Sequence, residues 1–281
     1  MSGWRADTVR LRAAAERRFP VITALTARLI AVNVLDAATR LAAQIFLTAV
    51  PLLFVVAAFA PRGVRDQLID SARDVFGLTG ASEQQLRQVH GSNDEELQQT
   101  TGAIGVVVTL LSATATSRAV ARICERAWRL PKSSARVAVW RWFAWIVAWL
   151  GVLVVQGPLR DGFGAGLWLG APLIFLADVP LWWWTQRLLL GARVPWRLLL
   201  PGAVITALAM TALSVTARVY MPTALNRSLA AYGSLGSIFT LLSWLIATCA
   251  VITFTITAGA VLATEPPLDH VLLRASDDVQ E

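Results

Sequence analysis

The last apolar run constrains the fold of this chain more than any other stretch. From Leu235 onward no Asp, Glu, Lys or Arg occurs until Glu265. The run from Tyr232 to Ala263 is long enough, at 1.5 Å per residue, to cross a hydrocarbon core of about 30 Å. Its second half carries small and hydroxyl-bearing residues, which let neighbouring helices approach closely and form hydrogen bonds in a membrane. The run therefore predicts a transmembrane helix that packs inside a bundle.

The remaining apolar runs extend this prediction to the whole chain. Of the 281 residues, 56% are hydrophobic and only 15% are charged, whereas a soluble domain carries about a quarter charged residues. We therefore expect an all-α, polytopic membrane protein, a bundle of six transmembrane helices with N-terminal and extracytoplasmic amphipathic helices. The expected spans are about 41–60, 102–117, 139–157, 165–184, 198–219 and 232–263, all within a bundle at 41–265.

Three segments are expected outside the bilayer. Residues 1–40 are basic and amphipathic, which predicts helices on the inner membrane surface whose arginines meet anionic headgroups, with a solvated basic arm as the alternative. Residues 62–101 carry amphipathic helical patterns with four basic and seven acidic residues. Residues 266–281 form a short cytoplasmic tail.

The positive residues predict the orientation. With both termini cytoplasmic, 18 of the 25 Lys and Arg fall in inner segments, as the positive-inside rule requires. The basic charge is thus assigned to the membrane surface and not to nucleic acid, and membrane lipids are the expected partners. Of the basic residues, 24 are Arg and one is Lys, which suggests a GC-rich bacterial gene.

The second span is expected to continue as a cytoplasmic helix bearing several arginines. On it, Glu125 is placed to pair with Arg129 at i,i+4, a surface pair of little energetic weight. The two cysteines, Cys124 and Cys249, are expected to be free thiols, because two cysteines supply neither a disulfide framework nor a zinc site.

Four segments are distinctive in sequence: RVPWRLLLPGAV at 193–204, AYGSLGSIFTLLSWLIATCAV at 231–251, DAATRLAAQIFLTAVPLLF at 36–54 and TGAIGVVVTLLSATATSRAVARICERAW at 101–128. They resemble the YihY/BrkB family of bacterial inner-membrane proteins, which implies a location in the bacterial plasma (inner) membrane. The resemblance implies a six-helix envelope protein and leaves the biochemical activity open, since the family's names reflect serum resistance, envelope integrity and an older assignment as a tRNA-processing ribonuclease. Where this family often has Gly-Ala-Glu near the end of the last helix, this chain has Gly259-Ala260-Val261.

Asp178 is the sharpest candidate for a functional residue. It lies within an expected span, just before Pro180, and an ionisable group at membrane depth is costly enough to suggest a function. We hypothesise that Asp178 lines a polar cavity and binds a cation, a proton or a substrate headgroup. The alternative is a structural carboxylate paired with an arginine near the inner face.

A second candidate group lies at the outer start of the last span. Tyr232, Gly233 and Gly236 belong to a Tyr-Gly-Ser-Leu-Gly motif whose glycines permit close approach, and a helix N-terminus favours an anion such as a lipid phosphate. Arg218 and Arg227 flank the motif and could bind a phosphate or face outer headgroups. The alternative is a tight junction between loop and helix.

A third group consists of Gln44 and Thr48, one turn apart beside Pro51 in the first span. These residues suit either a polar, kinked patch or hydrogen bonds between helices.

An enzyme is not expected. The only two histidines, His90 and His270, fall on opposite sides of the expected bilayer, so no metal-dependent nuclease site can form from them. No phosphate-cradling glycine loop or Ser-His-Asp arrangement occurs, and no metal or cofactor is expected. The sequence favours a protein that moves or organises a lipid-like substrate or supports envelope integrity. The alternative is a non-transporting scaffold that binds an envelope partner through residues 62–101.

Overall fold

The computed structural model describes residues 20–59, 114–131, 140–142, 144–149, 151–152 and 167–264. These residues form helices, and no strand occurs among them. The labelled helices are α2 (Pro20–Val32), α3 (Val34–Phe59), α8 (Leu167–Leu190) and α9 (Trp196–Thr264). A further helix at 114–127 carries no label. The all-α expectation is confirmed for the part of the chain described here.

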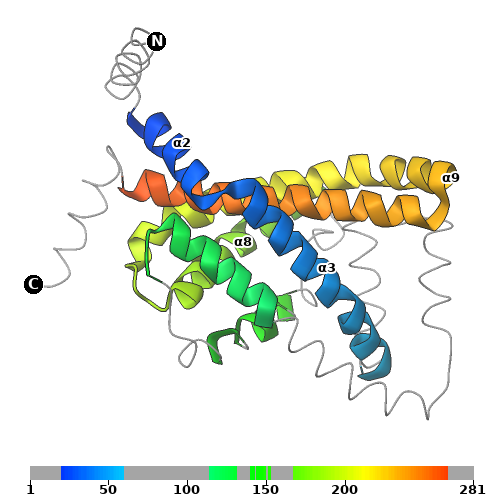
Figure 1. Ribbon diagram of the computed structural model, residues 1–281, viewed down its shortest axis with the longest axis horizontal. Helices are drawn as coiled ribbons and strands as arrows, with labels where there is room; N and C mark the ends of the chain where they lie inside the picture. The colour runs from blue at the N-terminus through cyan, green and yellow to red at the C-terminus, as the bar shows by residue number, and fades with distance from the viewer. Residues whose placement is uncertain are drawn as a thin grey trace, which may run out of the picture.

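Helix α9 is a hairpin of two long limbs. The chain reverses at Gly233, where φ is 63° and ψ is −152°, a conformation open essentially to glycine alone. The first limb is Trp196–Gly233, with 38 residues, and the second limb is Leu235–Thr264, with 30 residues. Figure 1 shows the two limbs side by side along their length, with the turn at one end of the molecule.

The two limbs approach most closely where both carry glycine. A β-carbon on Gly259 would fall 2.1 Å from the α-carbon of Gly202. One turn away, the hydroxyl of Thr206 donates to the hydroxyl of Thr255 across 3.0 Å. The hydroxyls along the second limb mostly bond to carbonyls of their own helix, which satisfies them without water. The small and hydroxyl residues of the last span therefore serve helix packing, as their pattern predicts.

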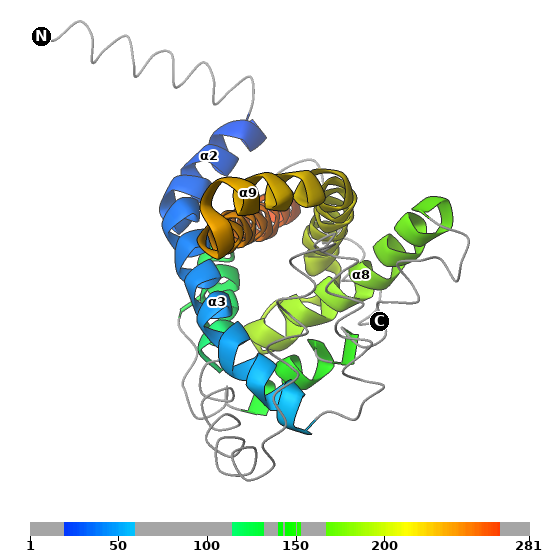
Figure 2. The same cartoon turned by 90° about the vertical axis from the view of Figure 1, so that its right-hand side faces the viewer.

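The other labelled helices pack on this hairpin. Helices α8, α3 and α2 all contact α9, and Figure 2 shows α2 and α3 along one side of it with α8 on another. The core they share is made largely of alanine, leucine and isoleucine side chains, among them Ala38, Leu41, Leu190, Leu199 and Ile256. The hairpin is thus the element against which the bundle is built.

Two of the described helices, the limbs of α9, are long and apolar enough to cross a membrane. A third span is possible if α2 and α3, which are bent by 47°, are taken as one broken span. The bend falls at Asn33, whose φ of 55° is a left-handed conformation that asparagine tolerates better than most residues. The expected count of six spans is not confirmed. Most of 102–117 and part of 139–157 lie outside the described residues, as do 1–19, 62–101 and 266–281. Helix α8, which covers most of the expected span at 165–184, is described but is not among these candidates.

The helix expected over 198–219 does not end at residue 219. The first limb continues as helix through Pro222 to Gly233, so no loop separates residues 220–231 from it. The reason lies in a stripe of buried residues at i,i+4 spacing, Ala217, Met221 and Leu225, which packs against Leu241 and Trp244 of the second limb. This packing outweighs the hydrogen bond that Pro222 removes.

Two charged residues also lie elsewhere than expected. Arg28 does not face headgroups, since it is 7% exposed and donates from Nη1 to the carbonyl of Ala127 at 2.5 Å. Glu125 does not lie on the surface, since it is 4% exposed and its carboxylate accepts from Arg193 at 2.6 Å. In both cases tertiary packing brings together residues far apart in sequence, which no local pattern can reveal.

Candidate functional site

A hollow formed by described residues lies between the two limbs of α9, near their turn. It is an open groove of about 1300 Å³, and both limbs line it. We call it the hairpin groove. Its main apolar and aromatic lining residues are Tyr220, Tyr232, Leu235, Phe239 and Trp244.

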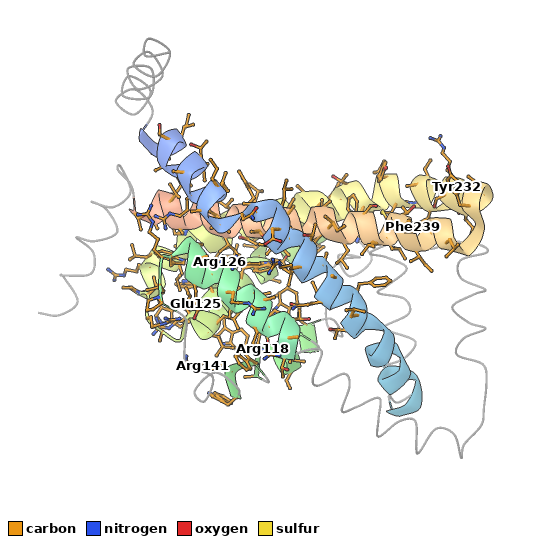
Figure 3. The ribbon with its side chains drawn as sticks, in the orientation of Figure 1. Arg118, Glu125, Arg126, Arg141, Tyr232 and Phe239 are labelled. Carbon is orange, nitrogen blue, oxygen red and sulfur yellow. The ribbon has the colours of Figure 1, made fainter. Side chains whose placement is uncertain are left out.

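Large apolar side chains of the groove are exposed. Tyr232 is 77% exposed, Phe239 64% and Leu235 62%. Figure 3 shows Tyr232 and Phe239 on the two limbs near the turn, at the far end of the hairpin from Glu125. A contiguous exposed apolar surface of this kind is typical of a contact with lipid, a ligand or another protein.

One cation stands in the groove. Arg227 is the only charged side chain among the described residues that line it, and it is exposed. From residue 196 to residue 264 the hairpin has three arginines and no Asp or Glu. Among the described lining residues the groove thus combines apolar side chains with one positive charge, which suits a molecule with an apolar body and an anionic head.

Glycine and aromatic contacts fix the shape of the groove. A β-carbon on Gly236 would fall 2.3 Å from the carbonyl oxygen of Ser228, so only glycine lets the second limb start this close to the first. At the other end of the groove the rings of Tyr220 and Trp244 stack at 6.1 Å between centroids, with 26° between their planes. Contacts between the limbs therefore fix their separation near both ends of the groove.

The expected site residues fall into separate places. Tyr232 and Gly236 line the hairpin groove, and Gly233 makes its turn. Arg218 is half-buried on the first limb, is not among the groove's lining residues, and is not free of partners. Asp178 is 7% exposed on α8 and is not an isolated charge. The structure therefore brings Tyr232, Gly233 and Gly236 together at the turn of the hairpin. Asp178 lies apart from them on α8.

The pair Gln44 and Thr48 contacts a neighbouring helix. The hydroxyl of Thr48 lies 2.7 Å from the carbonyl of Gln44 and 3.3 Å from the hydroxyl of Thr116 in the helix 114–127. This contact favours the interhelical reading of the pair. The Oε1 atom of Gln44 is buried and has no hydrogen-bond partner among the described residues.

A polar face of α8 points into the bundle. Thr185 and Gln186 are fully buried, and the hydroxyl of Thr185 and Nε2 of Gln186 lack partners within the described part of the chain. Gln186 packs on the first limb, since a β-carbon on Gly202 would lie 3.0 Å from its Oε1. Asp178 precedes Thr185 by seven residues, two helical turns, and so lies on the same side of α8.

The opposite end of the hairpin is held by arginines. Arg193, in the turn between α8 and α9, donates to the carbonyl of Leu190 at 2.8 Å and to that of Pro131 at 2.6 Å, besides its contact with Glu125. Arg187 lies over the ring of Trp196, 4.4 Å from its centroid. These contacts join three helices at the end of the hairpin that lies opposite the groove.

Burial makes Cys124 chemically quiet. It lies beside Glu125 at this junction, and burial, aided by the charge of Glu125, raises the pKa of its thiol from 9.0 to about 12. Both cysteines are free, as the sequence predicts, and the structure shows that both are buried. Among the residues that the structure describes, no group of His, Cys, Asp and Glu could hold a metal ion.

Sequence reasoning missed Phe239 and Trp244 as site residues. A signal for them exists in the length of the last apolar run. The second limb has 30 residues, whereas a hydrocarbon core of about 30 Å requires about 20. The surplus residues lie at its start, where the groove is.

The similarity of the chain to known proteins identifies its family. A family model described as Virulence factor BrkB matches residues 25–270. The chain belongs to the BrkB virulence factor family. This confirms the resemblance seen in the sequence, and the match covers all of the labelled helices except the first residues of α2. The searches of curated proteins and of solved structures found no match.

Membership of the BrkB family, together with the two long apolar limbs, establishes a membrane protein. Val261, the residue at which the sequence resemblance implied an acidic residue elsewhere in the family, is 1% exposed in this chain. A carboxylate at that point would be buried in the bundle. The hairpin groove does not depend on this position, because it lies near the other end of the second limb.

Proposed function

We propose that this BrkB-family membrane protein moves or organises a lipid-like, amphiphilic substrate, and that it thereby supports the integrity of a bacterial envelope. The observation that carries the proposal is the hairpin groove. It offers about 1300 Å³ lined by exposed aromatic and apolar side chains, with one arginine among them. A soluble polar substrate would gain little from such a surface, whereas acyl or polyprenyl chains would bury apolar area on it.

The buried polar face of α8 supports a role beyond static packing. Asp178, Thr185 and Gln186 are all buried in helices that contact the hairpin. Polar groups at membrane depth are costly and commonly mark pathways for ions or substrates. We propose that Asp178 acts in the moving step, by binding a proton, a cation or the head of the substrate, and that the groove acts in capture.

The proposed setting is the bacterial plasma membrane with both termini in the cytoplasm. This orientation places the junction of Glu125 and Arg193 at the inner face and the turn of the hairpin at the outer face. It is supported by the excess of arginine in the segments assigned to the inside. The proposal does not include an enzymatic step, a metal or a cofactor.

The test is movement of labelled lipid between the leaflets of proteoliposomes that contain the purified protein. A fluorescent phospholipid and a lipid-linked sugar precursor are followed separately, with empty vesicles as the control. We expect movement of at least one of the two, reduced in both Asp178→Asn and Phe239→Ser. Phe254→Ser is the matched control, because Phe254 is also exposed on the second limb but lies outside the groove.

Folded protein that moves neither lipid would overturn the transport proposal. That result would favour the alternative function, a non-transporting scaffold that binds an envelope partner through residues 62–101. Crosslinking from that segment, followed by identification of the captured protein, is the experiment for that reading.

A further inference from the structure

Two aromatic levels along α9 mark where the membrane begins and ends. At one end the indole of Trp183 donates to the carbonyl of Trp196 at 2.6 Å, and the two rings meet edge to face at 4.9 Å. At the other level Tyr220 stacks on Trp244. Tryptophan and tyrosine concentrate at the two membrane–water interfaces, where their apolar rings and polar atoms both find a match.

The spacing of these levels fits a bilayer. From Trp196 to Tyr220 the first limb rises 24 residues, about 36 Å at 1.5 Å per residue. From Trp244 to Thr264 the second limb rises 20 residues, about 30 Å. Both lengths agree with a hydrocarbon core of about 30 Å plus part of its interfaces. Neither limb requires an unusual tilt to fit between the two levels.

The rest of the hairpin must then project from the hydrocarbon core. The first limb has 38 residues, about 57 Å of helix, and even a tilt of about 40° would leave about 44 Å along the membrane normal, against a core of about 30 Å. Residues 221–243 lie beyond the level of Tyr220 and Trp244. The turn at Gly233 stands 13 residues past Tyr220, about 20 Å further along the helix.

The hairpin groove runs along this projecting part. Its lining starts at the level of Tyr220 and Trp244 and reaches Tyr232 and Leu235 beside the turn. Exposed side chains such as Leu235 and Phe239 would therefore stand outside the hydrocarbon core, where contact with water is unfavourable. The groove thus offers an apolar path that is continuous with the membrane and leads out of it.

Arg227 lies at a distance from the membrane at which it could bind the headgroup of a lipid in the groove. It lies seven residues past Tyr220, about 10 Å further from the membrane along the helix. It is exposed and lines the groove. The hairpin itself has no Asp or Glu between residues 196 and 264, and a guanidinium suits the bidentate contacts that arginine makes with phosphate.

We infer that the hairpin groove holds a phosphate-bearing lipid that has been raised partly out of the bilayer, with its phosphate against Arg227, near the level of Leu235, and its chain along Phe239 toward Tyr220 and Trp244. This inference rests on the proposed function and names the substrate class and its pose. A membrane phospholipid such as phosphatidylglycerol and a polyprenyl phosphate share this chemistry. For the raised lipid, contacts with the aromatic and apolar side chains of the groove replace the contacts that its chain makes with other lipids inside the bilayer.

The first arm of the test measures binding. Purified protein in a zwitterionic detergent is titrated separately with phosphatidylglycerol, undecaprenyl phosphate and phosphatidylcholine, and bound lipid is counted by native mass spectrometry. We expect retention of one of the two anionic lipids over phosphatidylcholine, and a loss of about tenfold in affinity in Arg227→Gln, as for one charge-assisted contact. Arg197→Gln is the matched control, since Arg197 is an exposed arginine at the other end of the same limb.

The second arm measures the height of the bound lipid. A photoreactive amino acid is placed at 235 in the groove, at 208 on the exposed middle of the first limb, and at 230, which is exposed near the turn but outside the groove lining. The lipid found in the first arm is supplied in proteoliposomes and crosslinked. We expect capture at 235 and at 208, and none at 230.

The outcomes separate this inference from the proposed function. Equal retention of all three lipids, an unchanged affinity in Arg227→Gln, or capture at 208 alone would overturn the raised pose even if lipid still moves between leaflets. Capture at 235 that depends on Arg227, with no movement between leaflets, would uphold the inference and overturn transport. If Arg227→Gln is poorly folded, Arg227→Lys replaces it and is expected to retain part of the affinity, because the charge remains.

Discussion

The carboxylate of Glu125 lies 2.6 Å from the guanidinium of Arg193, and this ion pair joins the helix 114–127 to the turn between α8 and α9. The same arginine bonds to the carbonyls of Leu190 and Pro131. A single side chain therefore ties together the ends of two helices and the start of the hairpin. The stability of the bundle at this face should depend on it.

Removal of the carboxylate is expected to be costly. The side chain of Glu125 is 6% exposed and that of Arg193 is 29% exposed, so Glu125→Ala leaves a partly buried guanidinium without its counter-ion. We expect a loss of about 3 kcal/mol, near the lower end for broken buried pairs because Arg193 keeps some contact with water. Thermal unfolding in detergent, followed by loss of the monodisperse peak, measures it.

The exposed pair of Asp36 and Arg40 provides the control for that measurement. Its side chains are 39% and 72% exposed at i,i+4 spacing, and Asp36→Ala should cost no more than about 0.5 kcal/mol. A Glu125→Ala protein as stable as Asp36→Ala would show that the junction does not hold the bundle together.

The contact of Gly259 with Gly202 gives a second prediction. A β-carbon on Gly259 would fall 2.1 Å from the α-carbon of Gly202, which is backbone and cannot rotate away. Gly259→Ala should therefore push the limbs apart and destabilise the protein by about 3 kcal/mol. Gly151→Ala is the matched control, because a β-carbon there meets nothing within 4 Å. Equal melting temperatures for the two variants would contradict the packing at this crossing.

The turn at Gly233 gives a third prediction, because a substitution there introduces backbone strain without steric crowding. A β-carbon there meets nothing within 4 Å, but φ is 63° and ψ is −152°. Gly233→Ala is expected to cost about 2 kcal/mol through backbone strain alone. Gly233→Asn should cost as much, because this ψ lies outside the left-handed helical region that asparagine tolerates. A neutral effect of both substitutions would mean that the limbs reverse by another route.

The sequence allowed the class of this protein to be predicted because class depends on composition and run length. The last span and its packing face follow from the absence of charge between Leu235 and Thr264 and from the recurring small residues. The Tyr-Gly-Ser-Leu-Gly motif was read correctly as a place of close backbone approach, which Gly236 makes against Ser228.

What could not be predicted depends on contacts distant in sequence. The continuation of the first limb past Pro222 rests on Met221 and Leu225 packing against the second limb, and a proline in an apolar segment ordinarily suggests an end or a kink. The burial of Arg28 and Glu125 requires partners 99 and 68 residues away. The groove itself emerges only when a helix longer than the bilayer is folded back on another.

The chemistry of Cys124 gives a prediction with a pH dependence. Maleimides react with thiolates, and burial raises the pKa of the Cys124 thiol to about 12. Between pH 7 and pH 9 the native thiol therefore stays protonated and out of reach, and it should not be labelled. An unfolded cysteine, with a pKa of about 8.5, becomes largely ionised over the same range, so its labelling should accelerate by more than tenfold.

We expect native protein to remain unlabelled at Cys124 at both pH values and to become labelled after denaturation in SDS, as measured by intact mass on a Cys249→Ser background. Ala27→Cys on that background serves as the exposed control, since Ala27 is exposed on α2. Rapid labelling of native Cys124 that rises with pH in step with Ala27→Cys would show that the junction around Glu125 opens to water.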